Sequence, residues 1–406
     1  MNDIAARRLH AQRLTGAPFT SPLDSVRWLT AVQSQDYGAA KWALAQRSRQ
    51  TTDVELDRLF DHGAILRTHV LRPTWHFVLP EDIGWLLALT GPRVRAGLVA
   101  RYRRLELDDK VAARAETLFT AALAGGSHLT RGELGEVLSA DRISPDGQRL
   151  PHLIMRAELD ALIASGPRRG KQFTYALLEE RVAKPRALDR EEAVAELTLR
   201  YFRSHGPAQI QDFLWWSGLR TADARAGIAL ADGALDHQTI EGKDYWFDAA
   251  ARPPGKATMV AHLLPNFDEY TVAYRDRAEI LHADRPFEAN VFSFGTILSN
   301  VVTVGGRVRG SWRRSVARGG VHLEVQPLDR FKRAETAAVE DAADRYGRFL
   351  DRPVELSWRK PKDPAPGWVG PIETSRFGSR AVMPAAGRPA TPGPGRTQTF
   401  QSYREP

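Results

Sequence analysis

The sequence predicts an α+β protein in which tandem winged-helix (helix-turn-helix) domains precede a C-terminal strand-rich, barrel-like domain. Two observations lead to this fold class. Three segments of the first 254 residues repeat one plan, in which a helix and a short helix pair are followed by a β-hairpin. From residue 255 onward the pattern changes to strands. With 406 residues, 43% of them apolar, the chain is large enough for several packed domains.

The first segment, residues 4–80, is expected to hold three helices and a wing. The predicted helices span 5–14, 23–33 and 53–61. Ser21 with Asp24 matches a capping box before the second helix, and Thr51 and Thr52 open the third. The run 64–79 is rich in β-branched and aromatic residues and is interrupted by Pro73, so it predicts two strands.

The second segment, residues 112–180, repeats this plan. Its predicted helices span 113–124, 129–138 and 152–164. Gly125 and Gly126 end the first of them, and Thr130 with Glu133 forms a capping box for the next. The sequence SGPRRGKQFTYALL then predicts a hairpin with a basic tip.

The third segment shows the pattern most clearly. Its predicted helices span 191–204, 208–217 and 221–231, with Gly206-Pro207 and Gly218 at the breaks between them. The alternating run HQTIEGKDYWFD predicts a hairpin that turns near Gly242.

The C-terminal part predicts strands within 259–274, 292–312 and 321–328, a helix at 334–350 and a last strand, VELSW. Nine of the 46 residues from Pro361 onward are proline, which predicts a disordered tail. The expected domains are 1–110, 111–188, 189–254, 255–360 and the tail 361–406.

Charge and its distribution favour a nucleic-acid partner. The formal net charge is +8, and basic residues gather at 93–104, 168–171 and 307–318. Solvated basic faces are the alternative reading. We take these side chains as candidate contacts to double-stranded DNA: Arg101, Arg103, Arg168, Arg169, Lys171, Arg313 and Arg314.

Several classes are excluded or disfavoured. The chain has no cysteine, which excludes disulfides, a thiolate nucleophile and cysteine-ligated metal sites. His69 and His76 are the only close histidine pair, a weak basis for a metal site, and we expect no metal and no cofactor. No signal peptide or membrane span is apparent. We therefore expect a monomer in the cytoplasm, associated with the nucleoid through DNA.

Two amides stand out at the end of the second predicted helix, Gln33 and Gln35 in the sequence VQSQDY. Taken alone, they fit solvent-exposed residues at a helix end. Six separated motifs change this reading: LHAQRLTG, LTAVQSQDYGAAKWAL, ILRTHVLRPTWHFVLPEDI, YFRSHGPAQIQDFLWWSGL, LLPNFDEYTVAYRDR and GGRVRGSWRR. Together, over about residues 4–355, they resemble the AlkZ/YcaQ superfamily of winged-helix DNA glycosylases, in the same order.

The resemblance implies that Gln33 and Gln35 form the catalytic Gln-x-Gln motif of the AlkZ-like branch. It also implies excision of guanines alkylated at ring nitrogen 7, including bulky adducts and interstrand crosslinks. Such a base is cationic and leaves readily, so a neutral carboxamide that places a water suffices. The sequence departs from the family pattern at Ser34, where an apolar residue is usual, and at Pro73, where many relatives have glycine.

Other residues of these motifs have two readings. Thr74 and His76, with Arg72 beside them, either line the groove and contact the DNA backbone or close a strand end. Asp268 and Glu269 fit an internal salt bridge better than a DNA-facing position. Trp215, Trp216 and Trp312 fit core positions.

The function that the sequence favours is a monofunctional DNA glycosylase in alkylation repair or in self-resistance to a genotoxic metabolite. A Schiff-base mechanism would need a desolvated lysine, and Lys41 is the only lysine before Lys110. The alternative is a non-catalytic winged-helix DNA binder, such as a transcriptional regulator, which would normally dimerise.

Overall fold

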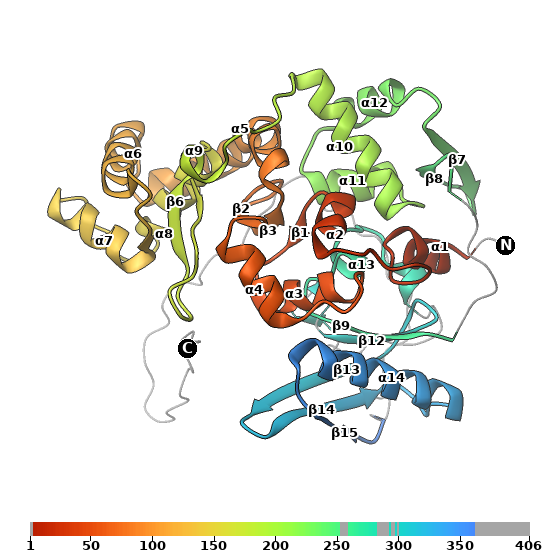
Figure 1. Ribbon diagram of the computed structural model, residues 1–406. Helices are drawn as coiled ribbons and strands as arrows, with labels where there is room; N and C mark the ends of the chain where they lie inside the picture. The colour runs from red at the N-terminus through yellow and green to blue at the C-terminus, as the bar shows by residue number, and fades with distance from the viewer. Residues whose placement is uncertain (1–2, 252–258, 282–291, 294–296, 299, 362–406) are drawn as a thin grey trace, which may run out of the picture. The chain divides into compact units, whose positions relative to one another are not determined.

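The computed structural model describes residues 3–251, 259–281, 292–293, 297–298 and 300–361 (Figure 1). These residues form a mixed α+β structure, which confirms the predicted fold class at that level. The tail predicted to be disordered lies outside the described residues except for Pro361.

The first segment forms helices around a small sheet. Its elements are α1 (Ile4–Ala11), α2 (Pro22–Leu29), β1 (Val32–Gln33), α3 (Tyr37–Ala45), α4 (Asp53–Asp61), β2 (Leu66–His69) and β3 (Trp75–Val78). The sheet order is β1-β3-β2, with antiparallel pairs. The helix at 53–61 and both predicted strands are confirmed, whereas α3 was not expected.

The helix predicted at 23–33 is wrong at its C-terminal end. α2 ends at Leu29, and Thr30 has φ 70° and ψ −51° while the Ala31 N–H donates to the Leu29 carbonyl at 2.9 Å. This geometry is a γ-turn with positive φ, which is rare and strained in a β-branched residue. The turn redirects the chain, so Gln33 lies in a strand and not at a helix end.

The predicted capping box before α2 is also wrong. Ser21 does cap the helix, but its side chain accepts the Leu23 N–H. Asp24 pairs instead with Arg27, at 2.8 Å. The predicted caps at Thr52 and Thr130 are confirmed as full capping boxes.

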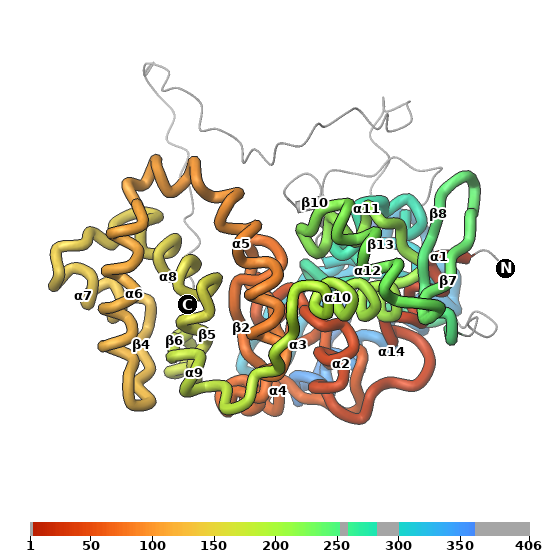
Figure 2. The backbone as a smooth tube through the Cα atoms, turned by 90° about the horizontal axis from the view of Figure 1, so that it is seen from above, coloured from red at the N-terminus to blue at the C-terminus, as the bar shows by residue number. Residues whose placement is uncertain are grey.

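A long helix that was not predicted, α5 (Pro80–Arg104), leads from the first segment to the second. It carries the arginines of the cluster at 93–104. Figure 2 shows α5 between the next two groups of helices, and it contacts a helix of each.

The second segment has the element order of the first. Its elements are α6 (Asp109–Leu123), β4 (Leu129–Thr130), α7 (Arg131–Ala140), α8 (Arg149–Leu159), β5 (Ile163–Ser165), β6 (Thr174–Leu177) and α9 (Leu178–Arg181). The sheet order β4-β6-β5 matches that of the first segment. The helix predicted at 152–164 ends early, because Ala161 takes φ 58° and the next apolar residues pair with β6.

The third segment repeats the order again. Its elements are α10 (Arg190–His205), α11 (Ile210–Ser217), α12 (Thr221–Leu230), β7 (Leu235–Ile240) and β8 (Lys243–Asp248). A single bridge between Ala208 and Trp246 stands where the other segments have their first strand. All predicted elements of this segment are confirmed, including the left-handed turn at Gly218 and the hairpin turn at Gly242.

The C-terminal part is an open sheet covered by a helix, and the described strands do not close into a barrel. Its elements are β9 (Ala261–Leu264), α13 (Glu269–Val272), η1 (Ala278–Ile280), β10 (Phe292–Ser293), β11 (Ile297–Leu298), β12 (Val301–Val304), β13 (Arg307–Ala317), β14 (Gly320–Pro327), α14 (Arg333–Leu350) and β15 (Val354–Trp358). The order of the main sheet is β15-β14-β13-β12-β9, and only β14 and β15 run parallel.

The C-terminal sheet shares a hydrophobic core with the first segment. The Trp42 indole of α3 donates to the Leu263 carbonyl of β9 at 2.6 Å, and its ring lies 4.9 Å from that of Tyr346 in α14. Trp312 is buried in the same core, as expected. The described residues form one compact unit by their contacts, and the four internal boundaries stay a prediction.

Candidate active site

Gln33, His76 and Thr68 form a row across the β1-β3-β2 sheet. Gln33 pairs with His76, and His76 pairs with Thr68, so the three side chains share one face. All three residues are buried. Among the described residues, Nε2 of His76 and Oγ1 of Thr68 have no hydrogen-bond partner. Buried polar atoms of this kind need a partner, which a ligand or a water molecule can supply.

Glu269 fixes the strand that carries Gln33. Its Oε1 accepts the Gln33 backbone N–H at 2.8 Å, and its Oε2 accepts the indole N–H of Trp216 at 2.9 Å. Burial would raise the pKa of Glu269, but His205, the Gln33 N–H and His76 together hold it below the ordinary value. Both oxygens of this buried carboxylate are therefore engaged, so Glu269 supports the site and is not a free base.

Arg72 lies beside the Gln33 amide, with Nη2 3.4 Å from Oε1. A tight turn positions it: Leu71 has φ 63°, and the Arg72 N–H donates to the Val70 carbonyl at 2.7 Å. The turn at Gly218, with φ 71°, packs against this segment so closely that a Cβ there would lie 2.7 Å from the Leu71 carbonyl oxygen. Such strained backbone is maintained only where the surrounding structure enforces it.

The remaining residues of the two motifs lie around this row. Gln35 is exposed just beyond β1, and Asp36 after it caps α3 by accepting the Ala39 N–H. Thr74 is half-buried before β3. Oγ1 of Thr74 and Oγ of Ser34 also have no hydrogen-bond partner in the described part of the chain. The two glutamines therefore differ: one amide is buried and the other faces solvent.

His76 is held neutral. Burial and the positive charge of Arg72 lower its pKa to about 4, while Glu269 acts in the opposite direction. Its Nδ1 lies 2.9 Å from the Thr74 carbonyl oxygen, so Nδ1 carries the proton and Nε2 is left as an acceptor. A neutral imidazole with a free acceptor can accept a hydrogen bond from water or sugar.

The buried histidines predict an acid-labile fold. Burial lowers the pKa of His76 to about 4 and that of His262 to about 3. Between pH 6.5 and 4 the unfolded chain binds protons that the folded chain does not, so the free energy of unfolding falls as pH falls. Each histidine contributes on the order of 3 kcal/mol to this loss once the pH has fallen to the pKa of the histidine in the folded protein.

Urea denaturation at several pH values from 7.5 to 4.5 checks this expectation. His76→Gln should flatten the pH dependence, whereas His10→Gln, at a half-exposed position, should leave it unchanged. A stability that is constant or rises from pH 7 to 5 would contradict the buried neutral state.

Lys41, in the segment after the glutamines, is not available as a nucleophile. It is buried, and its Nζ pairs with Asp53 at 2.7 Å and with Asp57 at 2.6 Å. The Tyr37 hydroxyl and Arg168 also contact Asp57. The ammonium is thus held within a cluster of ion pairs.

His69 and His76 do not form a metal site together. His76 pairs with Thr68, and the side chains of paired residues lie on the same face of the sheet. His69 is the next residue after Thr68 in the strand, so its side chain lies on the opposite face. His69 contacts Glu158 of α8. Among the described residues, no group of three or more His, Cys, Asp or Glu side chains is placed to hold a metal ion.

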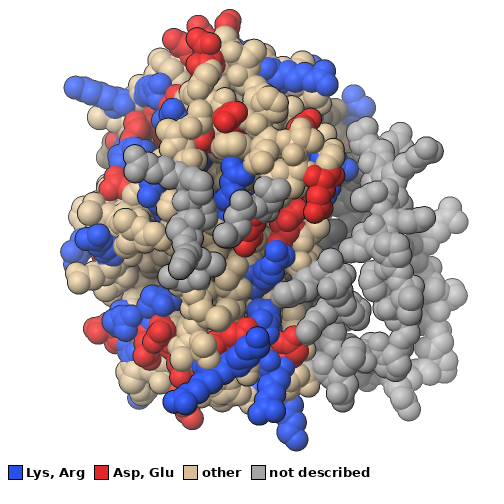
Figure 3. Space-filling view, turned by 90° about the vertical axis from the view of Figure 1, so that its right-hand side faces the viewer, with Lys and Arg blue, Asp and Glu red and all other residues tan. Residues whose placement is uncertain are grey.

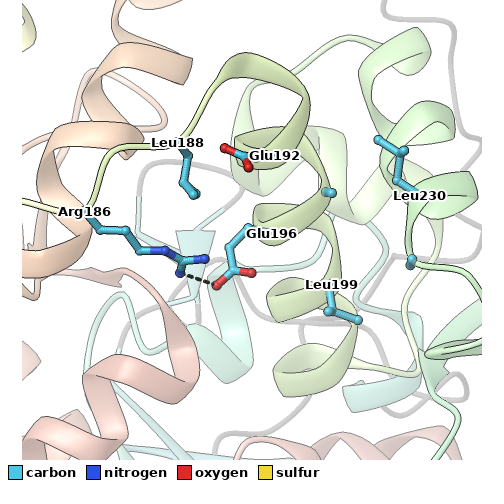
Figure 4. A pocket seen from close by; sticks show the side chains of 8 residues that line it. Arg186, Leu188, Glu192, Glu196, Leu199 and Leu230 are labelled. Atoms are coloured by element: carbon cyan, nitrogen blue, oxygen red, sulfur yellow. Dashed lines mark hydrogen bonds and ion pairs between the residues drawn. The ribbon is translucent and has the colours of Figure 1, made fainter.

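A separate pocket of about 300 Å³ lies beside α10 (Figure 4). Arg186 pairs with Glu196 at 2.8 Å in its wall. Its lining comprises Arg186, Leu188, Glu192, Ala195, Glu196, Leu199, Leu230 and Ala231. This lining offers no side-chain amide, imidazole or hydroxyl group, so the row around Gln33 is the candidate active site.

A family model described as AlkZ-like DNA glycosylase matches residues 26–349, most of the chain. The chain belongs to the AlkZ-like DNA glycosylase family. It is therefore a DNA glycosylase, an enzyme that acts on N-glycosyl bonds.

A curated sequence and a solved structure from Streptomyces sahachiroi agree with this assignment. An interstrand DNA cross-link repair glycosylase is 26% identical over 374 residues, which covers 85% of this chain and 95% of that protein. The solved structure of the DNA glycosylase AlkZ matches with a TM-score of 0.72 and 22% identity, over 87% of this chain and 98% of the other. At that identity the likeness shows a shared fold.

The glycosylase's candidate basic DNA contacts lie on three elements: α5, the β5–β6 hairpin and β13. Three of the arginines are partnered: Arg168 with Asp57 and Asp61, Arg169 with Glu133, and Arg314 with the Tyr346 hydroxyl. Arg101 contacts the neutral amide of Gln148. Arg103, Lys171 and Arg313 are exposed, without a side-chain partner among the described residues. On the face drawn in Figure 3, basic side chains lie among acidic ones.

Trp215 does not lie where the sequence indicates. Trp216 is fully buried, but Trp215 is 37% exposed and is not a core residue. Asp268 and Glu269 are both internal, as expected: Asp268 pairs with Arg47 at 2.8 Å, and Glu269 lies 3.6 Å from His205 and accepts the Gln33 N–H. The family motif that contains Glu269 signalled its importance, but no local pattern signalled its partner. Arg277, which contacts Trp215, was missed altogether.

Within the described residues, no helix is both long enough and apolar enough to cross a membrane.

Proposed function

We propose that this glycosylase hydrolyses the N-glycosidic bond of cationic guanines alkylated at ring nitrogen 7, without a covalent enzyme intermediate. Bulky adducts and interstrand crosslinks are included in the proposal, because a relative from Streptomyces sahachiroi is named for crosslink repair. The enzyme would act in DNA repair or in self-resistance to a genotoxic metabolite. The regulator alternative is not retained, since the chain belongs to a glycosylase family.

The observation that carries this proposal is that the described side chains around the motif include neither a free general base nor a free amine. These side chains are the amides of Gln33 and Gln35, the neutral imidazole of His76, hydroxyl groups and the guanidinium of Arg72. The nearby carboxylate of Glu269 and the ammonium of Lys41 are already paired. Such a site lacks a strong base and a nucleophilic amine, so it suits a leaving group that is already activated.

The alkylated base supplies the activation. Its positive charge makes it a good leaving group, and departure leaves a sugar with oxocarbenium character. The Gln33 and Gln35 amides accept from the attacking water and hold it beneath the anomeric carbon. The buried negative charge of Glu269, close behind Gln33, stabilises the positive charge that develops on the sugar.

We propose three winged-helix units as the DNA-binding scaffold. All three segments share one order of elements, and the first two share one sheet order. A helix pair followed by a hairpin is a common way to present a helix and a loop to duplex DNA. The candidate contacts on α5, on the β5–β6 hairpin and on β13 would then bind phosphates along the duplex.

A comparison of substrates tests the proposed chemistry. Under single-turnover conditions, an oligonucleotide with one N7-methylguanine should lose that base much faster than it does without enzyme. A duplex with hypoxanthine, a neutral purine lesion, should remain intact. Fast release of hypoxanthine, or none of the methylguanine, would remove the basis for the proposal.

Binding to undamaged duplex should weaken steeply with salt, because each phosphate contact releases counterions. Replacing both Arg101 and Arg103 by Glu should reduce the slope of log affinity against log salt by about two units. Replacing Arg333 and Arg348 of α14 by Glu changes the charge equally outside the proposed contacts and should have a smaller effect. An affinity that does not depend on salt would contradict DNA binding through these arginines.

A further inference from the structure

Trp215 is a partly exposed residue that contacts two arginines next to the candidate active site. It lies on α11, 37% exposed, and its indole N–H donates to the Val272 carbonyl of α13 at 2.9 Å. The guanidinium carbons of Arg72 and Arg277 each lie 5.7 Å from the centroid of its ring. Figure 1 shows α11 and α13 beside the strands that carry Gln33. Three segments distant in sequence thus meet at one point.

Neither guanidinium group forms an ion pair in the described part of the chain, and Nε of Arg72 and Nη2 of Arg277 are buried there without a hydrogen-bond partner. The acid nearest in sequence to Arg277, Asp276, pairs with Lys243 at 2.7 Å. Two like-charged groups that each keep an unbonded N–H favour an anion nearby.

The electrostatics agree with this geometry. Burial, and then the positive charge of Arg72, lower the pKa of Arg277 to about 10. The pKa of Arg72 is also lowered, chiefly by burial. Both groups stay charged at neutral pH; the charges of Glu269 near Arg72 and of Asp212 and Asp276 near Arg277 act against the effect of burial without reversing it.

We propose that Arg72, Trp215 and Arg277 bind a phosphodiester of the DNA strand that carries the damaged base. This inference rests on the proposed function, because it places the phosphate beside the lesion. Arg72 links the two sites: its Nη2 lies 3.4 Å from Oε1 of Gln33. A phosphate held there fixes the sugar of the damaged nucleotide near the Gln33 amide.

The indole and its neighbours make the site rigid. Trp215 presents its ring to both guanidinium groups and reduces their freedom, while Nε of Arg277 donates to the Thr271 carbonyl at 2.7 Å. Because guanidinium groups already lie against the indole, the ring orients them and is not itself a platform for a base. A planar guanidinium with open N–H groups matches the oxygens of a phosphodiester.

The experiment combines one protein change with one DNA change. Wild type and Arg277→Gln are titrated with duplexes that contain a tetrahydrofuran abasic-site analogue. In matched duplexes, a neutral methylphosphonate replaces the phosphodiester on the 5′ or the 3′ side of the analogue. Arg275→Gln, an exposed arginine of the same loop, is the control. Thermal denaturation checks that the variants are folded.

Wild type should bind about 10- to 100-fold more weakly when the contacted phosphate is neutral, and Arg277→Gln should show part of that loss on the normal duplex, because Arg72 keeps its contact. The two changes together should cost less than the sum of their separate effects, because the neutral phosphate already removes the Arg277 contact. Trp215→Ala should give a smaller loss with the same coupling. Arg275→Gln should keep the wild-type response to the methylphosphonate.

Additive effects of the two changes at both phosphate positions would overturn the proposal. Equal losses for Arg275→Gln and Arg277→Gln would also overturn it, because they would show a general charge effect. This binding test uses no cleavable base, so it stands apart from the proposed chemistry. If methylguanine were not released while the coupling was found, the phosphate site would hold and the proposed substrate would fail.

Discussion

Asp268→Ala is expected to destabilise the fold by about 3–5 kcal/mol. Asp268 and Arg47 are both fully buried, and two hydrogen bonds of 2.9 and 2.8 Å join the carboxylate to the guanidinium. Removing the carboxylate leaves the arginine charge buried without its partner. Equilibrium denaturation by urea measures the loss as a shift of the midpoint.

Two matched variants define what this result means. Asp24→Ala removes the acid of an exposed pair with Arg27 and should change stability by less than about 1 kcal/mol. Replacing Arg47 by Met together with Asp268 by Leu should recover much of the stability lost in Asp268→Ala. If Asp268→Ala were as mild as Asp24→Ala, the buried pair would not hold the β9–α13 region in place.

Elements with strong local signals could be predicted from the sequence. The helix at 53–61 and the helices of the third segment were found because capping residues, Gly218 and apolar periodicity agree there. The ends of α2 and α8 were missed because tertiary contacts decide them. Thr30 and Ala161 adopt positive φ, which no local preference of Thr or Ala predicts. α5 contains Pro92, which local rules place outside helices.

The candidate site was only partly predictable. The family pattern located Gln33 and Gln35, but their different exposure follows from the turn at Thr30 and the short strand β1. Glu269, which accepts the Gln33 backbone N–H, lies 236 positions away in the sequence. A single sequence carries no spacing signal for such contacts. Likewise, the sequence does not distinguish exposed Trp215 from its buried neighbour, because the contact of Trp215 with Val272 of α13 forms only in the folded chain.

Gln33→Ala and Gln35→Ala are each expected to slow excision of a cationic alkylguanine by roughly 30- to 1000-fold. This corresponds to about 2–4 kcal/mol for losing one well-placed hydrogen bond to the attacking water. Duplex affinity should change little, because the amides act on the nucleophile. The effect should be smaller for adducts that depart quickly without enzyme. Gln326→Ala, a half-exposed glutamine on β14, is the matched control.

The most direct test of a water-positioning amide site is single-turnover release of N7-methylguanine by wild type and by the variant with both glutamines replaced by alanine. We expect a loss at least as large as that of either single variant, with normal folding and normal duplex binding. Full activity of the folded double variant would contradict it and would show that these glutamines have no catalytic role.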